Sequence, residues 1–198
     1  SATGNAGAGD DLGNAIALGG GFGCFAIHPC ALGENRRLRK GELHLERIMT
    51  FRSYMDQALD QARAAADRGE VPVGAVIVDP AGQVVAADGN RTRELNDPSA
   101  HAEMLVIRQA CATLGVDRLV GYDLYVTLEP CAMCAAVIAN ARIGRLYYGA
   151  ADEKSGGVAQ GPRVFSHPQT HHKPEIYDMI NAQDCQALLK EFFANKRG

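Results

Sequence analysis

Three residues that bind metals well stand in two short segments of this sequence. His101 comes two positions before Glu103, and Cys131 and Cys134 stand three residues apart directly after Pro130. One imidazole and two thiolates can hold a tetrahedral zinc ion and leave its fourth position open for water. Because an open position is typical of catalytic rather than structural zinc, the pattern predicts a catalytic metal centre. Glu103 would then carry protons beside the metal rather than bind it.

The elements that position these residues follow from their spacing. Cys131 and Cys134 share one helix face if a helix starts near Pro130, because residues i and i+3 are neighbours on a helix surface. Proline suits the first turn of a helix, and the positive end of the helix dipole favours thiolates. Residues i and i+2 point to different sides of a helix, so we expect His101 and Glu103 at a helix entry. There His101 can reach the metal and Glu103 can reach its water.

Hydrophobic periodicity and turn residues predict an alternation of strands and helices after residue 50. The expected helices span 51–68, 100–114, the segment from the Cys motif to Asn140, and 184–195. The expected strands span 75–78, 83–87, 124–128, 145–149 and 176–180, with a long loop over 151–174. This order is typical of an α/β layer fold, in which sites form where strands or loops meet helices.

The first 48 residues differ from the rest of the chain. Nine of the 22 glycines fall in the first 33 residues, and no amphipathic period is present. We interpret residues 1–48 as a disordered or non-native leader and residues 49–198 as one catalytic domain. A phosphate-binding glycine loop at 19–23 is the alternative, but no strand-then-helix pattern surrounds it.

Composition narrows the possible partners and the compartment. The net charge of −3 and the pI of about 6.1 argue against non-specific nucleic-acid binding, although a local basic patch remains compatible with them. The sequence contains no run of 18 apolar residues, so it predicts no transmembrane helix. The four cysteines outside the motif lack metal-ligand spacing, which favours a reducing, cytoplasmic setting.

Two simpler readings of the motifs compete with a catalytic centre. In a structural zinc site, His167, His171 or His172 would supply a fourth ligand. In a redox protein, the two cysteines would form a reactive pair. Both leave Glu103 without a task, so a catalytic zinc is the better prediction.

From Met49 onward the sequence closely resembles the bacterial tRNA-specific adenosine deaminases, the TadA-like group of the cytidine deaminase superfamily. The H-x-E and P-C-x-x-C motifs indicate the superfamily. The further matching pieces are Glu70–Val76, Gly89–Arg91, Asp97–Glu103, Tyr125–Cys134, Gly149–Gly156 and Glu191–Phe193. The loop over 161–167 is the part that departs from the family.

The resemblance implies a fold, a reaction and an assembly. The implied fold is a three-layer α/β/α cytidine-deaminase-like fold with a five-stranded mixed sheet. The implied reaction is zinc-dependent hydrolytic deamination of adenosine to inosine at the wobble position of a tRNA anticodon stem-loop. The implied assembly is a homodimer with one Zn²⁺ per subunit, whose partner helps hold the anticodon loop.

Site residues follow from the same resemblance. Glu103 is the implied catalytic residue, and the implied zinc ligands are His101, Cys131 and Cys134. The implied substrate contacts are Asn90, the backbone N–H of Ala102, Val71, Leu128, Pro130 and Asp152. Candidate phosphate contacts are Arg91, Arg93, Lys154 and Arg163.

Two other functions remain as alternatives. A deaminase of a free nucleobase or nucleoside, such as guanine, cytosine or cytidine, would close its pocket over a small substrate and would not use a basic rim. A zinc-stabilised binding module would have no use for Glu103 as a proton carrier. The steep salt dependence of phosphate contacts would separate an RNA substrate from a free base.

Overall fold

The structure is a computed structural model, and it describes residues 51–196. The predicted leader over 1–48 lies outside these residues and stays a prediction. In the part of the chain that is described, no helix is long and apolar enough to cross a membrane.

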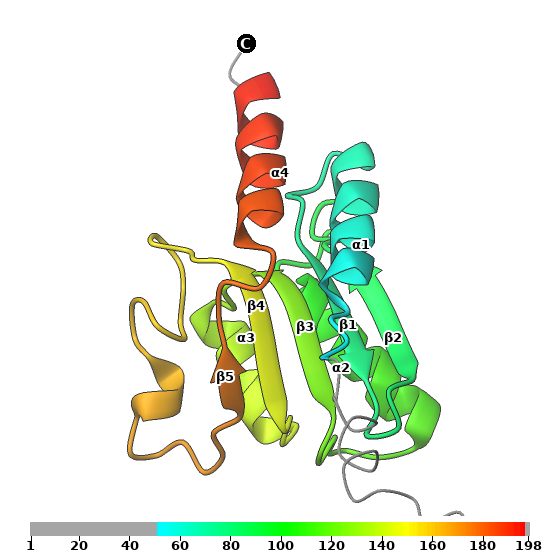
Figure 1. The fold of residues 1–198 in the computed structure, drawn as a ribbon, viewed down its shortest axis with the longest axis vertical. Helices are drawn as coiled ribbons and strands as arrows, with labels where there is room; N and C mark the ends of the chain where they lie inside the picture. The colour runs from blue at the N-terminus through cyan, green and yellow to red at the C-terminus, as the bar shows by residue number, and fades with distance from the viewer. Residues whose placement is uncertain (1–50, 197–198) are drawn as a thin grey trace, which may run out of the picture. The chain divides into compact units, whose positions relative to one another are not determined.

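Four helices and five strands alternate along the described chain (Figure 1). Their bounds are α1 Met55–Asp67, β1 Gly74–Val78, β2 Val84–Gly89, α2 Ala102–Leu114, β3 Asp123–Leu128, α3 Ala132–Asn140, β4 Arg145–Ala150, β5 Glu175–Tyr177 and α4 Ala182–Asn195. A short 3-10 helix, η2, spans Val164–Ser166 inside the long loop. The predicted order of elements is confirmed, and η2 is an additional element that periodicity does not predict.

The five strands form one mixed sheet in the order β2-β1-β3-β4-β5. β1 pairs antiparallel with both β2 and β3, whereas β4 is parallel to β3 and β5 is parallel to β4. Each parallel step needs a crossover, and α3 supplies the one between β3 and β4. The predicted five-stranded mixed sheet is therefore confirmed.

Helices cover both faces of the sheet and make three layers. Alternate residues of β1 enter two separate cores, because side chains on a strand point to opposite faces. Ala75 and Ile77 pack with residues of α2 and α3, whereas Val76 and Val78 pack with residues of α1. Figure 1 shows α2 and α3 behind the sheet and α1 in front of it. Residues of α4 pack in the same core as those of α1. All five residues of β1 are buried, as a central strand covered on both faces requires.

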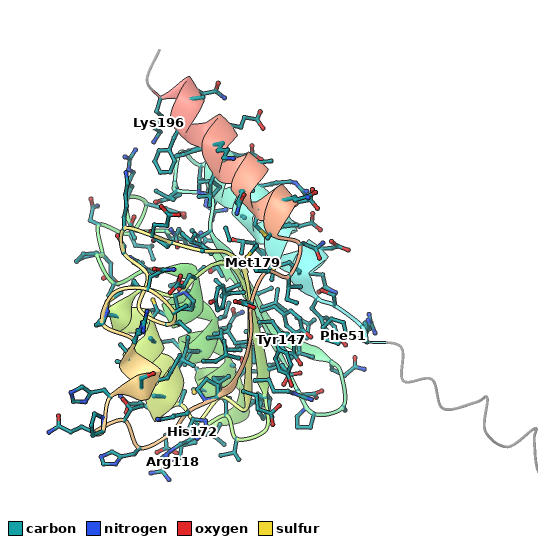
Figure 2. All side chains as sticks on the ribbon, turned by 60° about the vertical axis from the view of Figure 1, so that its left-hand side comes forward. Phe51, Arg118, Tyr147, His172, Met179 and Lys196 are labelled. Carbon is teal, nitrogen blue, oxygen red and sulfur yellow. The ribbon has the colours of Figure 1, made fainter. Side chains whose placement is uncertain are left out.

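A stack of tyrosines runs across three neighbouring strands on the α1 side. Tyr125, Tyr147 and Tyr177 occupy matching positions of β3, β4 and β5. The middle one, Tyr147, is labelled in Figure 2. The ring centroids of Tyr125 and Tyr147 lie 4.3 Å apart, and those of Tyr147 and Tyr177 lie 4.7 Å apart. These aromatic pairs supply contact area in a chain that has no Trp and few aromatic residues.

Two sequence predictions differ from the structure in detail. Periodicity places Met55, Leu59, Ala62 and Ala66 on one face of the first helix. In the structure Ala65 is buried on that face, and Ala66 is only partly buried. The buried stripe continues from Ala62 to Ala65 at a spacing of three, which leaves Ala66 at its border. The fifth strand is shorter than expected and ends at Tyr177, after which Met179 adopts a positive φ.

Candidate active site

Two helix N-termini bring the predicted ligands together. His101 and Cys131 are the N-cap residues of α2 and α3, and both have extended backbone, with ψ angles of 152° and 173°. Cys134 follows on the buried face of α3. Pro130 thus precedes the N-cap rather than opening the helix. Because the positive ends of two helix dipoles meet here, the location favours thiolates and a carboxylate.

The three ligand atoms have the spacing that a tetrahedral zinc ion requires. His101 Nδ1 lies 3.7 Å from Cys131 Sγ and 3.6 Å from Cys134 Sγ, and all three atoms lie within 4.8 Å of one another. Typical zinc–nitrogen and zinc–sulfur bond lengths place N and S about 3.6 Å apart in a tetrahedron. The side chains present therefore fit zinc. Among residues 51–196 this is the one group of three or more such side chains close enough to share an ion.

The two thiols differ in their environment. Hydrogen bonding from Cys134 and from His101 lowers the pKa of Cys131 to about 4. The same pairing with Cys131, together with burial, raises the pKa of Cys134. The chain alone thus stabilises one thiolate, and binding a zinc ion requires the second thiol to lose its proton as well.

Glu103 lies next to this group on the first turn of α2. Its side chain is buried, with 3% of the residue exposed, and burial raises the pKa of its carboxyl group. The Oε2 atom has no hydrogen-bond partner among the described residues, although it is buried. A buried carboxyl with a raised pKa and a free oxygen is well suited to accept and return a proton.

Asn90 and Ala102 form one unit rather than two independent contacts. The backbone N–H of Ala102 donates to Asn90 Oδ1 at 2.9 Å. The family resemblance implies a contact of this N–H with the purine, whereas in the structure Asn90 accepts it. The Asn90 side-chain amide nitrogen has no partner in the described part of the chain. It is the donor that this unit can offer to a base.

A cavity of about 240 Å³ opens in front of Glu103 and the metal ligands. Its lining consists of Val71, Val73, Asn90, Thr92, His101, Glu103, Leu128, Glu129, Cys131, Asp152 and Ser155. Four of the six predicted substrate contacts are among them. The two exceptions are Ala102, whose N–H is taken by Asn90, and Pro130, which is buried and does not line the cavity.

Two buried glutamates that sequence analysis did not identify as site residues hold the loops at the cavity rim. Glu70, with 1% of the residue exposed, accepts hydrogen bonds from Thr92 Oγ1 and from the N–H groups of Arg93 and Glu94. Glu129, with 2% exposed, accepts from backbone N–H groups of the loop after β4. The sequence does offer one signal, because each of these acidic residues stands beside an apolar strand region. An acidic side chain is costly to bury there without hydrogen-bond partners.

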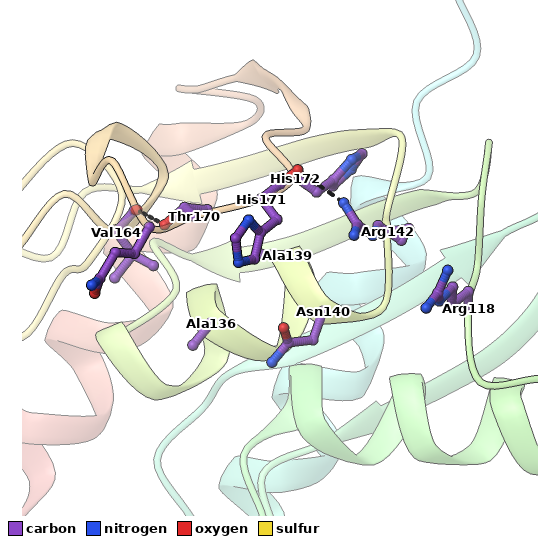
Figure 3. A pocket seen from close by; sticks show the side chains of 10 residues that line it. Arg118, Ala136, Ala139, Asn140, Arg142, Val164, Thr170, His171 and His172 are labelled. Carbon is purple, nitrogen blue, oxygen red and sulfur yellow. Dashed lines mark hydrogen bonds between the residues drawn. The ribbon is translucent and has the colours of Figure 1, made fainter.

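The later histidines do not join the metal group. His171 and His172 line a second cavity, of about 270 Å³, with Arg118, Arg142 and residues from the C-terminal half of α3 (Figure 3). There Arg142 Nη1 donates to the His171 carbonyl at 2.9 Å, and His172 Nε2 lies 2.6 Å from the Ile143 carbonyl oxygen. A structural zinc site with one of these histidines as fourth ligand is therefore not what the chain forms.

The candidate phosphate contacts divide into paired and free side chains. Arg91 forms ion pairs with Asp88 at 3.0 Å and with Glu94 at 2.8 Å. Arg93 and Arg163 donate to backbone carbonyls of Gly69 and Ala159. Lys154 is exposed and has no ion pair within the described range. Of the four, Lys154 is the side chain best placed to meet a phosphate.

Comparison with known proteins identifies the family. The model of the cytidine and deoxycytidylate deaminase zinc-binding region matches residues 49–150. A tRNA-specific adenosine deaminase of Agrobacterium fabrum (strain C58) is 56% identical over 144 residues, which are 73% of this chain and 94% of that protein. The chain belongs to the tRNA-specific adenosine deaminase family.

Another member of this deaminase family matches a similar length of the chain, and a solved structure shares its fold. The tRNA-specific adenosine deaminase of Rickettsia felis is 49% identical, with 72% of this chain and 100% of that protein covered. A structure solved in a study of A-to-I editing by tRNA:A34 deaminases at the wobble position of transfer RNA is 57% identical. It superposes with a TM-score of 0.68 and covers 69% of this chain and 98% of its own. The cytidine-deaminase-like fold and the zinc cofactor of this deaminase are thereby shown.

Proposed function

We propose that this chain is a zinc-dependent tRNA adenosine deaminase that converts adenosine to inosine at the wobble position of the anticodon. The observation that carries the proposal is the position of Glu103. A buried carboxyl with a partner-free oxygen lies beside a three-ligand metal group, inside a cavity that also holds an amide for base recognition. The 56% identical relative is a tRNA-specific adenosine deaminase, which supports RNA as the substrate class.

Glu103 moves the protons of the reaction. A zinc ion held by His101, Cys131 and Cys134 would supply Lewis-acid activation of water. Glu103 accepts a proton from the attacking water and delivers it to N1 of adenine, while the water oxygen bonds to C6. The second water proton reaches the amino group, the C6–N bond breaks, and ammonia leaves. Water and adenosine thus become inosine and ammonia, and Glu103 returns to its starting state.

Other residues hold the base and exclude water. Val71 and Leu128 offer apolar walls to the purine, and the Asn90 amide nitrogen can donate to an acceptor on its edge. The target nucleotide must leave the stack of the anticodon loop to enter a cavity of this size. Asp152 lies at the rim, where a neighbouring nucleotide of the RNA would pass.

We further propose that the protein acts as a homodimer in the cytoplasm and that the partner helps hold the anticodon loop. Helix α3 supports this assembly because it carries no charged residue, and Ala132 and Ala136 on its outer side are exposed. An apolar outer face is unusual for a helix in contact with water. Light scattering of the wild-type protein against an Ala136→Glu variant tests the dimer, and a monomeric wild type would contradict it.

The substrate class is tested with a panel of candidate substrates. Zinc-loaded protein is incubated with an anticodon stem-loop carrying a wobble adenosine, and separately with free adenine, guanine, cytosine and cytidine. Mass spectrometry detects deamination of each. We expect inosine in the RNA alone. Turnover of a free base with inert RNA would contradict the proposal and leave only the zinc-deaminase chemistry.

A further inference from the structure

Glu129 makes an unusual set of contacts for a residue directly after a strand. Its Oε1 atom accepts hydrogen bonds from the backbone N–H groups of Val158, Ala159 and Gln160 at 3.1, 2.8 and 2.9 Å. Its Oε2 atom accepts a fourth bond from the N–H of Asp152 at 3.2 Å. The four donors come from both ends of one loop, so a single carboxylate closes the segment 152–160.

These contacts suit the ionised form of Glu129. An ionised carboxylate only accepts hydrogen bonds, and all four partners are donors. The side chain is buried, and no ion pair within residues 51–196 includes it. Converging backbone N–H groups therefore take the place of a counter-ion, as they do in anion-binding turns of the main chain.

The loop packs so closely against the Glu129 carboxylate that no space remains for a further side-chain atom. A Cβ atom at Gly156 would lie 2.7 Å from Glu129 Oε1 and 2.5 Å from the Asp152 carbonyl oxygen. A Cβ atom at Gly157 would lie 2.5 Å from the backbone nitrogen of Ala132, at the start of α3. The loop thus fits between Glu129 and α3 only because these two residues are glycines.

The loop held in this way forms one wall of the active-site cavity. Asp152 and Ser155 line the cavity together with Glu103. Asp152 is itself the first donor to Glu129, and Ser155 lies between it and the next donor, Val158. No regular helix or strand spans residues 151–160. The position of Asp152 and Ser155 therefore depends on contacts such as those of Glu129.

Glu129 itself does not act on the substrate. Both of its oxygens already accept hydrogen bonds from backbone N–H groups, and only 2% of the residue is exposed, so its carboxylate is committed to the loop rather than to a reacting group. It does not belong to the group that could share a metal ion. Its effect on the reaction must pass through the loop.

We propose that Glu129 is a positioning residue that fixes the loop over 152–160 as the substrate-binding wall of the cavity. This inference rests on the proposed function, because the RNA is the substrate that the wall would contact. Loosening the loop weakens substrate binding, while the zinc ligands and Glu103 remain on α2 and α3. The expected signature is a change in KM rather than in kcat.

The test compares three variants of the full chain with the wild type. In Glu129→Gln the amide oxygen can keep the three bonds of Oε1, but the amide nitrogen meets the Asp152 N–H as donor against donor. Gly156→Ala disturbs the same contact from the loop side and leaves the carboxylate in place. Asp123→Asn is the matched control, because Asp123 is a buried carboxylate at the opposite end of β3, bonded to Arg145 at 2.6 Å.

Steady-state deamination of the stem-loop and zinc content are measured for all four proteins. We expect Glu129→Gln and Gly156→Ala to raise KM by about tenfold, the factor for losing one charge-assisted hydrogen bond, with full zinc content. Their kcat should stay within about threefold of the wild type, and Asp123→Asn should change neither constant. Unchanged KM in both loop variants, or loss of zinc from Glu129→Gln, would overturn the inference.

The wild-type arm separates this inference from the proposed function. If the wild-type chain does not deaminate the stem-loop, the proposed function fails before any variant is compared. Hydrogen exchange on the wild-type chain tests the loop without relying on a variant that folds. The N–H groups of Val158, Ala159 and Gln160 should exchange slowly, and exchange at the rate of an open loop would contradict the role of Glu129.

Discussion

The two sides of the active-site cavity are held in different ways. On one side, His101, Glu103 and Cys131 begin helices that pack into the core between α2, α3 and the sheet. On the other side, Thr92, Asp152 and Ser155 lie in loops, which Glu70 and Glu129 hold through backbone N–H groups.

This difference separates two tasks. Groups that react must keep their geometry closely, and helix ends fixed by core packing provide it. Residues that contact a large and variable substrate are commonly carried on loops. In this chain the loops are not left loose, because two buried carboxylates fix them. We therefore expect changes on the helix side to affect the chemistry and changes on the loop side to affect substrate binding.

The largest effect is expected from removing a metal ligand. Cys131→Ala leaves two ligands, so the protein should lose its zinc and all deamination activity. Metal analysis and inosine formation measure both. Cys111→Ala is the control, because Cys111 lies outside the metal group. A Cys131→Ala protein that keeps zinc and activity would show that the helix side does not hold the metal.

Replacing the proton carrier should affect turnover alone. Glu103→Gln keeps the size of the side chain but cannot shuttle a proton, so kcat should fall by about 10²–10⁴-fold. Zinc content should equal that of the wild type, since Glu103 is not among the ligands. If Glu103→Gln turned over RNA at the wild-type rate, another group would have to move the protons.

Asn90 joins the two sides, so its removal should have an intermediate effect on both stability and binding. Asn90→Ala leaves the buried N–H of Ala102 without its acceptor, which costs about 1–3 kcal/mol in the free energy of unfolding. The same change removes the amide donor from the cavity and should raise KM. Urea unfolding and steady-state kinetics measure the two effects. Asn140→Ala, at an exposed position at the end of α3, is the control and should change neither.

The smallest effects are expected among the basic residues of the loops. Arg91 is already paired with Asp88 and Glu94, so Arg91→Ala should leave the salt dependence of RNA binding nearly unchanged. Lys154→Ala should reduce the slope of log affinity against log salt by about one. Binding measured across a salt series would distinguish them, and the reverse ranking would place the RNA on the other rim of the cavity.

The sequence predicted the helix side of the site better than the loop side. His101, Glu103, Cys131 and Cys134 lie in two short segments, where spacing alone specifies which side chains can meet. The order of strands and helices followed from local periodicity in the same way. The apolar strand β3 and the Pro-Cys segment after it could be predicted because each pattern involves only residues that are adjacent in the sequence.

Contacts between a side chain and backbone groups far away in the sequence leave no such pattern in the sequence. Glu129 bonds to N–H groups between 23 and 31 residues away, and every residue except proline carries such a group. The bond from the Ala102 N–H to Asn90 is of the same kind, because it joins a backbone group to a side chain 12 residues away. The contact of Ala102 with the purine is implied by the family resemblance alone and stays a prediction. Only the folded chain shows which backbone groups remain free to bind a substrate.

One measurement tests the division of tasks most directly. Glu103→Gln and Glu129→Gln are compared on the same anticodon stem-loop, with zinc content determined for each protein. Loss of kcat with little change in KM is predicted for Glu103→Gln, and a raised KM with nearly unchanged kcat is predicted for Glu129→Gln. If both zinc-loaded variants lost kcat to the same extent at unchanged KM, the separation of a chemical side from a substrate-holding side would be wrong.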